Sequence, residues 1–158
     1  MDTSEDQYKL LFKNESETKF FAFQLAKIIQ PKDVIALNGD LGTGKTVFAR
    51  AFVEAVTGEV EVPSPTFTLL QSYEGVDVTV YHFDLYRIED PNEVFELGIE
   101  EAFSDGVSII EWPDRMAPYL PNQRLEIYLS NGCSNNAREF QILAVGEKWK
   151  KKLAILDL

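Results

Sequence analysis

Two short apolar runs predict buried strands in the middle of the chain. Residues 34–37 are continuously apolar, residues 107–110 are nearly so, and both contain β-branched residues. Such runs are typical of strands that are buried on both faces of a parallel sheet. Between them, Lys45–Thr57 is rich in Ala, Val and Phe, and Gly58 follows where a helix C-cap would lie. This order predicts strands and helices of an α/β fold.

Nearer the N-terminus, a polar cap precedes an amphipathic helix. Asn14 is followed three residues later by Glu17, which is the pattern of a helix start. Apolar residues then recur at spacings of three and four through residues 19–29, and Pro31 ends the helix. We expect its buried face to contain Phe20, Phe21, Phe23, Ala26 and Ile28 or Ile29.

The other patterned segments predict a hairpin, two more strands and two more helices. Two β-rich runs flank the dipeptide Glu74-Gly75, which is typical of an antiparallel hairpin. The hairpin is expected over 66–73 and 76–83, the strands over 124–129 and 139–145, and the helices over 91–97 and 147–158. No repeat or long linker divides the chain, so we expect one domain over residues 1–158.

A glycine-rich segment between the first predicted strand and its helix carries the chemistry. Residues 39–46 read Gly-Asp-Leu-Gly-Thr-Gly-Lys-Thr and fit the pattern G-x-x-x-x-G-K-[ST] in the context that it requires. Its glycines let backbone amides form an anion-binding nest at the positive end of the helix dipole. The alternative is a turn that only links a strand to a helix. The motif predicts a P-loop NTPase-like three-layer sandwich with a mixed, mostly parallel central sheet plus antiparallel hairpin strands.

Two residues of this loop would contact the nucleotide and its metal. Lys45 would bridge the β- and γ-phosphates, and the Thr46 hydroxyl would bind the Mg²⁺ that those phosphates hold. Such a site also needs an acidic residue at the end of a neighbouring strand. Glu111 and Asp84 are the two candidates, because each ends an apolar strand. The alternative for either carboxylate is a solvated strand end or a helix cap.

Three other polar features have competing interpretations. His82, the single histidine, is more often a packed side chain than a catalyst in an alternating strand. Arg87 would pair with an acid, either in the site or as a plain salt bridge. The basic stretch 148–152 is interpreted as a solvated helix face.

Composition restricts the partners. The 158 residues contain 26 acidic and 15 basic side chains, which gives a net charge of -11. A nucleic-acid-binding protein normally presents a basic face, so we expect no DNA partner and no direct binding of RNA. No apolar run reaches the roughly 18 residues of a membrane helix and no leader is visible, so a cytoplasmic protein is expected. Cys133 is expected to be an inert surface thiol.

The order of short motifs resembles that of a known family. The loop at 39–46 is followed by Ser64-Pro-Thr-Phe67, Tyr81-His-Phe-Asp-Leu-Tyr-Arg87, Leu97-Gly98 and Ile110-Glu-Trp112, as in the bacterial TsaE family, also called YjeE. The resemblance runs from about residue 14 to residue 138. The string that contains His82 is highly specific, whereas the loop alone is not. Thr43 and Pro63 depart from the family, which usually has Ala and commonly has Lys at these positions.

The resemblance implies a small ATPase that is required for threonylcarbamoyladenosine formation beside the anticodon of tRNA. Proteins of this kind use ATP and Mg²⁺ and act with TsaB and TsaD, so tRNA would be met only through that complex. The implied catalytic residues are Lys45, Asp84 and Glu111, and the implied metal ligands are Thr46 and Glu111. The implied nucleotide contacts are Asn14, Gly42, Thr43, Gly44, Lys45, Thr46, Thr66 and Arg138, with residues 64–66 acting as a switch near the γ-phosphate.

Other functions of a P-loop remain open from the sequence. A small-molecule or nucleoside kinase would use the same loop, but such enzymes usually bring several arginines and a lid, and the five arginines here are scattered. A GTPase switch would need Asn-Lys-x-Asp and Asp-x-x-Gly, neither of which occurs. A third alternative is a nucleotide-dependent interaction module that hydrolyses almost no nucleotide by itself. This alternative overlaps with the ATPase, because an ATPase that is active only when bound to its partners would look inert alone.

Overall fold

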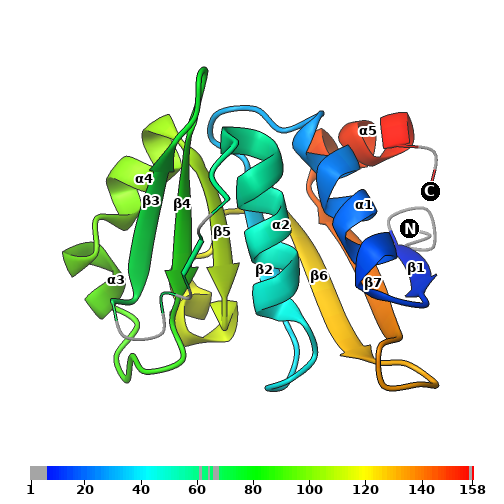
Figure 1. Ribbon diagram of the computed structural model, residues 1–158. Coiled ribbons are helices and arrows are strands. Elements are labelled where there is room, and N and C mark those ends of the chain that lie inside the picture. The colour runs from blue at the N-terminus through cyan, green and yellow to red at the C-terminus, as the bar shows by residue number, and fades with distance from the viewer. Residues whose placement is uncertain (1–6, 61, 64, 66–67, 157) are drawn as a thin grey trace.

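A seven-stranded mixed sheet forms the middle layer of the protein (Figure 1). The computed structural model describes residues 7–60, 62–63, 65, 68–156 and 158. The strands are β1 (Gln7–Phe12), β2 (Val34–Asn38), β3 (Leu70–Glu74), β4 (Thr79–Asp84), β5 (Val107–Glu111), β6 (Arg124–Asn131) and β7 (Arg138–Val145). Their order across the sheet is β1-β7-β6-β2-β5-β4-β3.

The parallel part of the sheet is confined to its centre. Strands β6, β2, β5 and β4 make three parallel pairings, and the flanking strands add three antiparallel ones. The mixed sheet with its parallel centre and the antiparallel β3–β4 hairpin are confirmed. One edge strand, β1, was not predicted, and it pairs antiparallel with β7.

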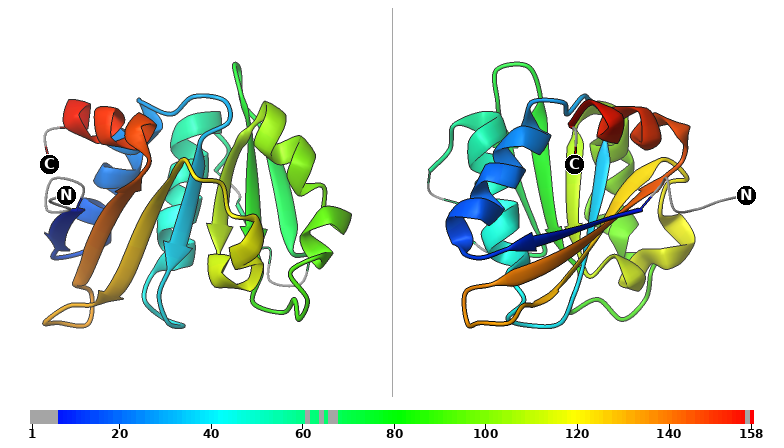
Figure 2. Two further views of the ribbon diagram at one scale, coloured as in Figure 1. Left: turned by 180° about the vertical axis from the view of Figure 1, so that it is seen from behind. Right: turned by 90° about the vertical axis from the view of Figure 1, so that its right-hand side faces the viewer.

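Helices cover both faces of the sheet and complete three layers (Figure 2). On one side, α1 (Glu15–Ala26), α2 (Lys45–Thr57) and α5 (Glu147–Leu156) contribute buried residues to one apolar cluster with the strands. On the other side, α3 (Glu93–Glu96), α4 (Ile99–Asp105) and a 3₁₀ segment (Pro113–Tyr119) contribute to a second cluster. Among the described residues, no helix is both long and apolar enough to cross a membrane.

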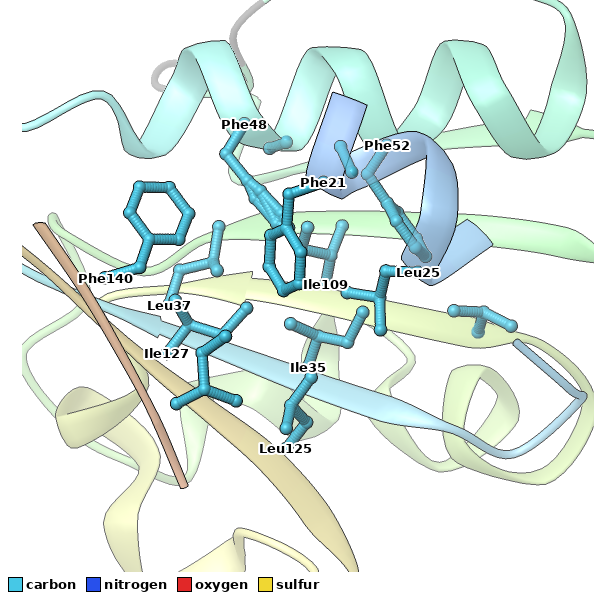
Figure 3. Close-up of a cluster of buried hydrophobic side chains, with 14 of the residues drawn as sticks. Phe21, Leu25, Ile35, Leu37, Phe48, Phe52, Ile109, Leu125, Ile127 and Phe140 are labelled. Carbon is cyan, nitrogen blue, oxygen red and sulfur yellow. The ribbon is translucent and has the colours of Figure 1, made fainter. Parts of the chain in front are cut away.

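Aromatic packing fixes α2 to the sheet and to α1 (Figure 3). The ring of Phe48 lies 5.9 Å from that of Phe21 on α1 and 5.6 Å from that of Phe140 on β7, measured between centroids. Each of these rings is buried, and full burial of one such side chain is worth about 1.5–3 kcal/mol. The helix that begins at Lys45 therefore has a fixed position over the carboxyl end of β2.

The first helix is confirmed, but its buried face differs from the prediction. The Asn14 side chain caps it by accepting a hydrogen bond from the Glu17 amide at 3.1 Å. The buried stripe is Thr18, Phe21, Ala22 and Leu25, whereas Phe20 and Phe23 are 62% and 49% exposed. A helix turns 100° per residue, so these two rings cannot share the face of Phe21 and Leu25.

The basic C-terminal helix is only partly solvated, which corrects a second prediction. Lys152 is buried, and its Nζ lies 2.8 Å from Oδ2 of the fully buried Asp33. Lys148 Nζ lies 2.6 Å from Oδ1 of the same carboxylate. These two lysines therefore fix α5 to the residue that precedes β2, while Lys151 faces solvent as expected.

The segment between β4 and β5 forms two short helices where one was predicted. The expected helix over 91–97 is shortened to α3, and Gly98 then adopts a left-handed conformation, with φ 85°, from which α4 begins. The predicted α2 begins and ends as expected, at Lys45 and Thr57, with Gly58 as a left-handed C-cap. Cys133 is an exposed free thiol, as expected.

Candidate functional site

The loop between β2 and α2 needs glycine because of its backbone conformation. Gly39, Gly42 and Gly44 have φ angles of 149°, 81° and 96°, which L side chains rarely adopt. A Cβ atom at Gly39 would also lie 2.6 Å from the carbonyl oxygen of Leu129. Gly44 starts α2 without any side-chain cap, so the amides of the first helical turn remain available to an anion.

This loop borders a cavity of about 390 Å³ at the carboxyl end of the parallel strands. Ligands of open α/β sheets bind at this edge. The cavity is lined by Leu41, Gly42, Gly44, Lys45, Thr46, Val47, Asp84, Tyr86, Glu111, Trp112 and Arg138. The structure thus brings the loop, both candidate carboxylates and a distant arginine to one place.

Lys45 lies at the bottom of this site and is almost fully buried. Its ammonium donates to the carbonyl of Gly39 at 2.5 Å and lies 3.5 Å from the centroid of the Trp112 ring. Burial lowers the pKa of Lys45, and the nearby carboxylates, Glu111 first, oppose that shift. A carbonyl and an aromatic face are weaker partners for a cation than a phosphate group is.

The two carboxylates lie side by side because the strands that carry them are neighbours. Asp84 and Glu111 are directly paired in the parallel register of β4 and β5. Both are buried, at 6% and 3% exposure, so the alternative of solvated strand ends is wrong for these residues. Oδ1 of Asp84 accepts a hydrogen bond from the Tyr86 amide at 3.1 Å. Buried acids that line a cavity are candidates for catalysis or metal binding.

Thr46 and Glu111 offer oxygen atoms at a separation that suits Mg²⁺. The Thr46 hydroxyl lies 3.4 Å from Oε1 of Glu111. Octahedral Mg²⁺, with bonds of about 2.1 Å, places adjacent ligand oxygens roughly 3 Å apart. Among the described residues, no group of three or more His, Cys, Asp or Glu side chains could hold a metal. This donor set fits an ion that keeps several waters and is also bound by substrate phosphates.

His82 is part of the site, which the sequence did not indicate. Its Nε2 lies 2.7 Å from Oε2 of Glu111, and both side chains are buried. Residues two apart on a strand share a face, so the position of His82 relative to Asp84 could have suggested this arrangement. The interpretation of His82 as a hydrogen-bonded packing residue is correct, but its partner lies in the site.

Trp112 and Tyr86 also lie in the site, although neither was predicted to have a role there. Their ring centroids are 5.0 Å apart, and both residues line the cavity. Trp112 directly follows β5 and has a φ of 60°, a conformation that is unusual for a bulky residue. Arg87, in contrast, is exposed and does not belong to this lining.

The remaining predicted contacts lie at different distances from the loop. Arg138 lines the main cavity and an adjoining one of about 30 Å³, which Glu15 and Thr18 also line. Asn14 lines neither, because its side chain caps α1. Thr43 is buried, and its hydroxyl donates to the Asp40 carbonyl at 2.7 Å, inside the loop. Thr66 and Ser64 lie outside the described residues.

Comparison with known proteins identifies a family and several relatives that this chain resembles. The family described as "Threonylcarbamoyl adenosine biosynthesis protein TsaE" matches residues 12–140. The protein named tRNA threonylcarbamoyladenosine biosynthesis protein TsaE from Rickettsia conorii is 39% identical, and the match covers 91% of this chain and 82% of that protein. The protein of the same name from Bacillus subtilis is 38% identical, and the match covers 87% of this chain and 85% of that protein. The crystal structure of Bacillus subtilis YdiB superposes with a TM-score of 0.79, at 33% identity, over 96% of this chain and 94% of that one.

Proposed function

This chain belongs to the TsaE family of tRNA threonylcarbamoyladenosine biosynthesis proteins, and from that premise we propose that it binds and hydrolyses Mg²⁺-ATP. The family membership and the P-loop NTPase-like fold are the foundation of this proposal. The nucleotide, the metal and the hydrolysis are the steps that we add, and each of them is inferred from the residues of the cavity.

One observation carries the proposal. A buried lysine, a threonine hydroxyl and two buried carboxylates surround a single cavity at the start of α2, and they come from three separate elements of the fold. A turn that only linked a strand to a helix would not require Lys45 to be buried beside Glu111 and Asp84. Burying a lysine without such a task costs free energy.

The binding step follows from the geometry of the loop. The free amides at the start of α2 and the inward-facing loop backbone would hold the phosphates. Lys45 would exchange the Gly39 carbonyl and the Trp112 ring for phosphate oxygens, which are stronger partners. Thr46 and Glu111 would hold Mg²⁺ through their facing oxygens. When Mg²⁺ is bound, it would neutralise the charge that develops on the phosphates.

The hydrolytic step needs a group that orients water, and Asp84 would take this role. It lies beside Glu111 on the neighbouring strand and lines the same cavity. The water oxygen would attack the γ-phosphorus, the bond from that phosphorus to the β–γ bridging oxygen would break, and ADP and phosphate would leave. Asp84 would accept a hydrogen bond from the attacking water, whose proton passes to the products.

We assign the partners by family membership together with charge. An acidic chain of net charge -11 is suited to protein contacts rather than to tRNA, so the TsaB and TsaD proteins are the proposed partners and hold the tRNA. Nucleotide turnover would then reset the complex between rounds of modification. Weak hydrolysis by the isolated chain and stimulation by the partners are the expected behaviour.

The test is a phosphate-release assay with and without TsaB and TsaD. We expect turnover to rise when both partners are present and to fall at least about 100-fold in Lys45→Ala, since transition-state contacts of this kind contribute several kcal/mol. In Glu111→Ala the Mg²⁺ requirement of nucleotide binding should weaken, whereas Asp84→Ala should keep it and lose turnover. Unchanged turnover in Lys45→Ala, or phosphate found on an acceptor molecule instead of in solution, contradicts the proposal.

A further inference from the structure

We infer that His82 is a positioning residue, which holds the Glu111 carboxylate so that its second oxygen faces Thr46. This inference deepens the proposed function. Its consequence for Mg²⁺ binding rests on that function, because Glu111 and Thr46 are the pair that would hold the metal. The arrangement itself involves only side chains of this chain.

The sheet places His82 where it can reach Glu111. Alternation puts His82 and Asp84 of β4 on the same face as Val80, a core residue under the helices α1 and α2. On β5, Val107, Ile109 and Glu111 share that face. In the parallel register His82 is paired with Ile109, two positions before the pair of Asp84 and Glu111. The imidazole therefore meets the Glu111 side chain diagonally from the neighbouring strand.

The two oxygens of Glu111 have different partners. Oε2 lies 2.7 Å from Nε2 of His82, and Oε1 lies 3.4 Å from the Thr46 hydroxyl. A hydrogen bond of 2.7 Å is short enough to fix the rotation of the carboxylate, whereas 3.4 Å is a loose contact. The histidine thus determines the direction of the group, and the oxygen directed at Thr46 is left for the metal.

Burial makes this contact more important than an exposed one. The His82 side chain is fully buried and that of Glu111 is only 4% exposed, so their contact is shielded from bulk water. The inference holds for a neutral ring protonated at Nε2 and for a charged ring, because Nε2 donates in both. Groups that orient metal ligands in this way typically change metal affinity or activity by about 10- to 100-fold when they are removed.

Two variants separate the hydrogen bond from the bulk of the side chain. His82→Leu fills the same space without a donor, and His82→Gln can offer an amide N–H near the position of Nε2. Val80→Ala is the matched control, because it disturbs the same strand and face but lies in the apolar core and not in the cavity lining. If the leucine variant does not fold, His82→Asn takes its place, since its shorter amide does not reach as far as Nε2.

Crystal structures of the nucleotide-free variants test the positioning itself. We expect the Glu111 carboxylate to turn away from Thr46 in His82→Leu and to keep its place in His82→Gln and Val80→Ala. A Glu111 side chain that is unmoved in the leucine variant overturns the inference. So does a Glu111 that is displaced equally in the valine control. Neither outcome depends on whether the protein hydrolyses ATP.

Calorimetric titration of ADP at a series of Mg²⁺ concentrations tests the consequence. His82→Leu should require about 10- to 100-fold more Mg²⁺ for half-maximal binding of ADP. His82→Gln should restore most of this loss. The affinity for ADP without Mg²⁺ should be unchanged in both variants. Equal loss of affinity with and without the metal would mean a general structural defect and would overturn the metal role. If the unaltered protein binds no ADP at all, the proposed function fails, and the crystal structures still decide the positioning.

Discussion

At the scale of single residues, the loop at residues 39–46 combines a backbone that glycine adopts readily with a buried charge. Its three glycines have positive φ angles, and Lys45 is buried with a lowered pKa although carboxylates lie near it. Burial of the charge costs folding free energy, and this cost makes sense if the loop is shaped for an anion. A bound phosphate would recover part of the cost by pairing with the ammonium and with the free amides.

The glycines of the loop are not equivalent, and Gly39 should be the least replaceable. An added Cβ at Gly39 meets the Leu129 carbonyl at 2.6 Å and the Thr43 hydroxyl at 2.8 Å, while at Gly42 it meets nothing within 4 Å. We expect Gly42→Ala to cost about 1–2 kcal/mol from its left-handed conformation alone. Gly39→Ala should cost at least about 2 kcal/mol more, since a backbone carbonyl cannot move aside easily. Urea unfolding of both variants measures the difference.

Gly42→Ala is also the control for this comparison. The two variants share the same chemical change in the same loop, so a common effect on unfolding would mean that only conformational strain matters. In that case the close approach of β6 to the loop would not contribute to the cost of Gly39→Ala. Equal midpoints with equal m-values would contradict the prediction.

The sequence singled out four polar residues that line the cavity but not the residues around them. Lys45, Thr46, Asp84 and Glu111 could be singled out because a loop motif and strand ends are local patterns. The contact between His82 and Glu111 joins residues 29 positions apart, and it depends on the register between two strands. Register is set by packing of the whole sheet, so a single sequence without that sheet does not reveal the partner.

At the scale of elements, the buried Asp33 connects the C-terminal helix to the central strand. Its two oxygens lie within 2.8 Å of Lys148 and Lys152, and Lys152 also donates to the carbonyl of Ile28 at 3.0 Å. Because β2 leads directly into the phosphate loop, α5 supports the strand that carries the site. A buried carboxylate that loses its paired cations destabilises the folded protein.

We therefore predict that Lys152→Met destabilises the protein although the side chain keeps its length. The change removes one of the two lysines that pair with Asp33 and leaves Lys148 and the Gln30 amide as its described partners, and breaking a buried ion pair costs about 3–5 kcal/mol. Lys151→Met is the control, since Lys151 is exposed, and its effect should stay within about 0.5 kcal/mol. Chemical denaturation followed by circular dichroism gives both values. Similar stabilities of the two variants would show that Asp33 is not held mainly by Lys152.

The elements were predicted best where one pattern dominates over many residues. The helix α2 and the strand β5 were found because a long amphipathic run and a short apolar run are distinct patterns. The division of 91–105 into α3 and α4 was not found, because Gly98 interrupts the helix by its backbone conformation. The exposure of Phe20 and Phe23 was missed because hydrophobicity was taken as burial, although exposed apolar residues are common.

At the scale of the whole molecule, the site and the charge point to different partners. The four side chains to which we assign binding and hydrolysis of ATP, those of Lys45, Thr46, Asp84 and Glu111, line one cavity at the edge of the parallel strands. The net charge of -11 gives this chain no general means of attracting a polyanion. We therefore expect that, in tRNA modification, other proteins hold the tRNA.

This division of labour predicts that the isolated chain does not bind tRNA. Binding would require several phosphates to be neutralised, and it would weaken steeply as salt is raised. In a filter-binding assay at about 50 mM salt, where such contacts are strongest, we expect no retention by this chain and clear retention once TsaB and TsaD are added. A Lys45→Ala variant should behave identically when alone, because its lysine faces the cavity. Salt-sensitive retention of tRNA by the isolated chain would mean that a local basic surface overrides the net charge, and the proposed division between energy coupling and RNA binding would then be wrong.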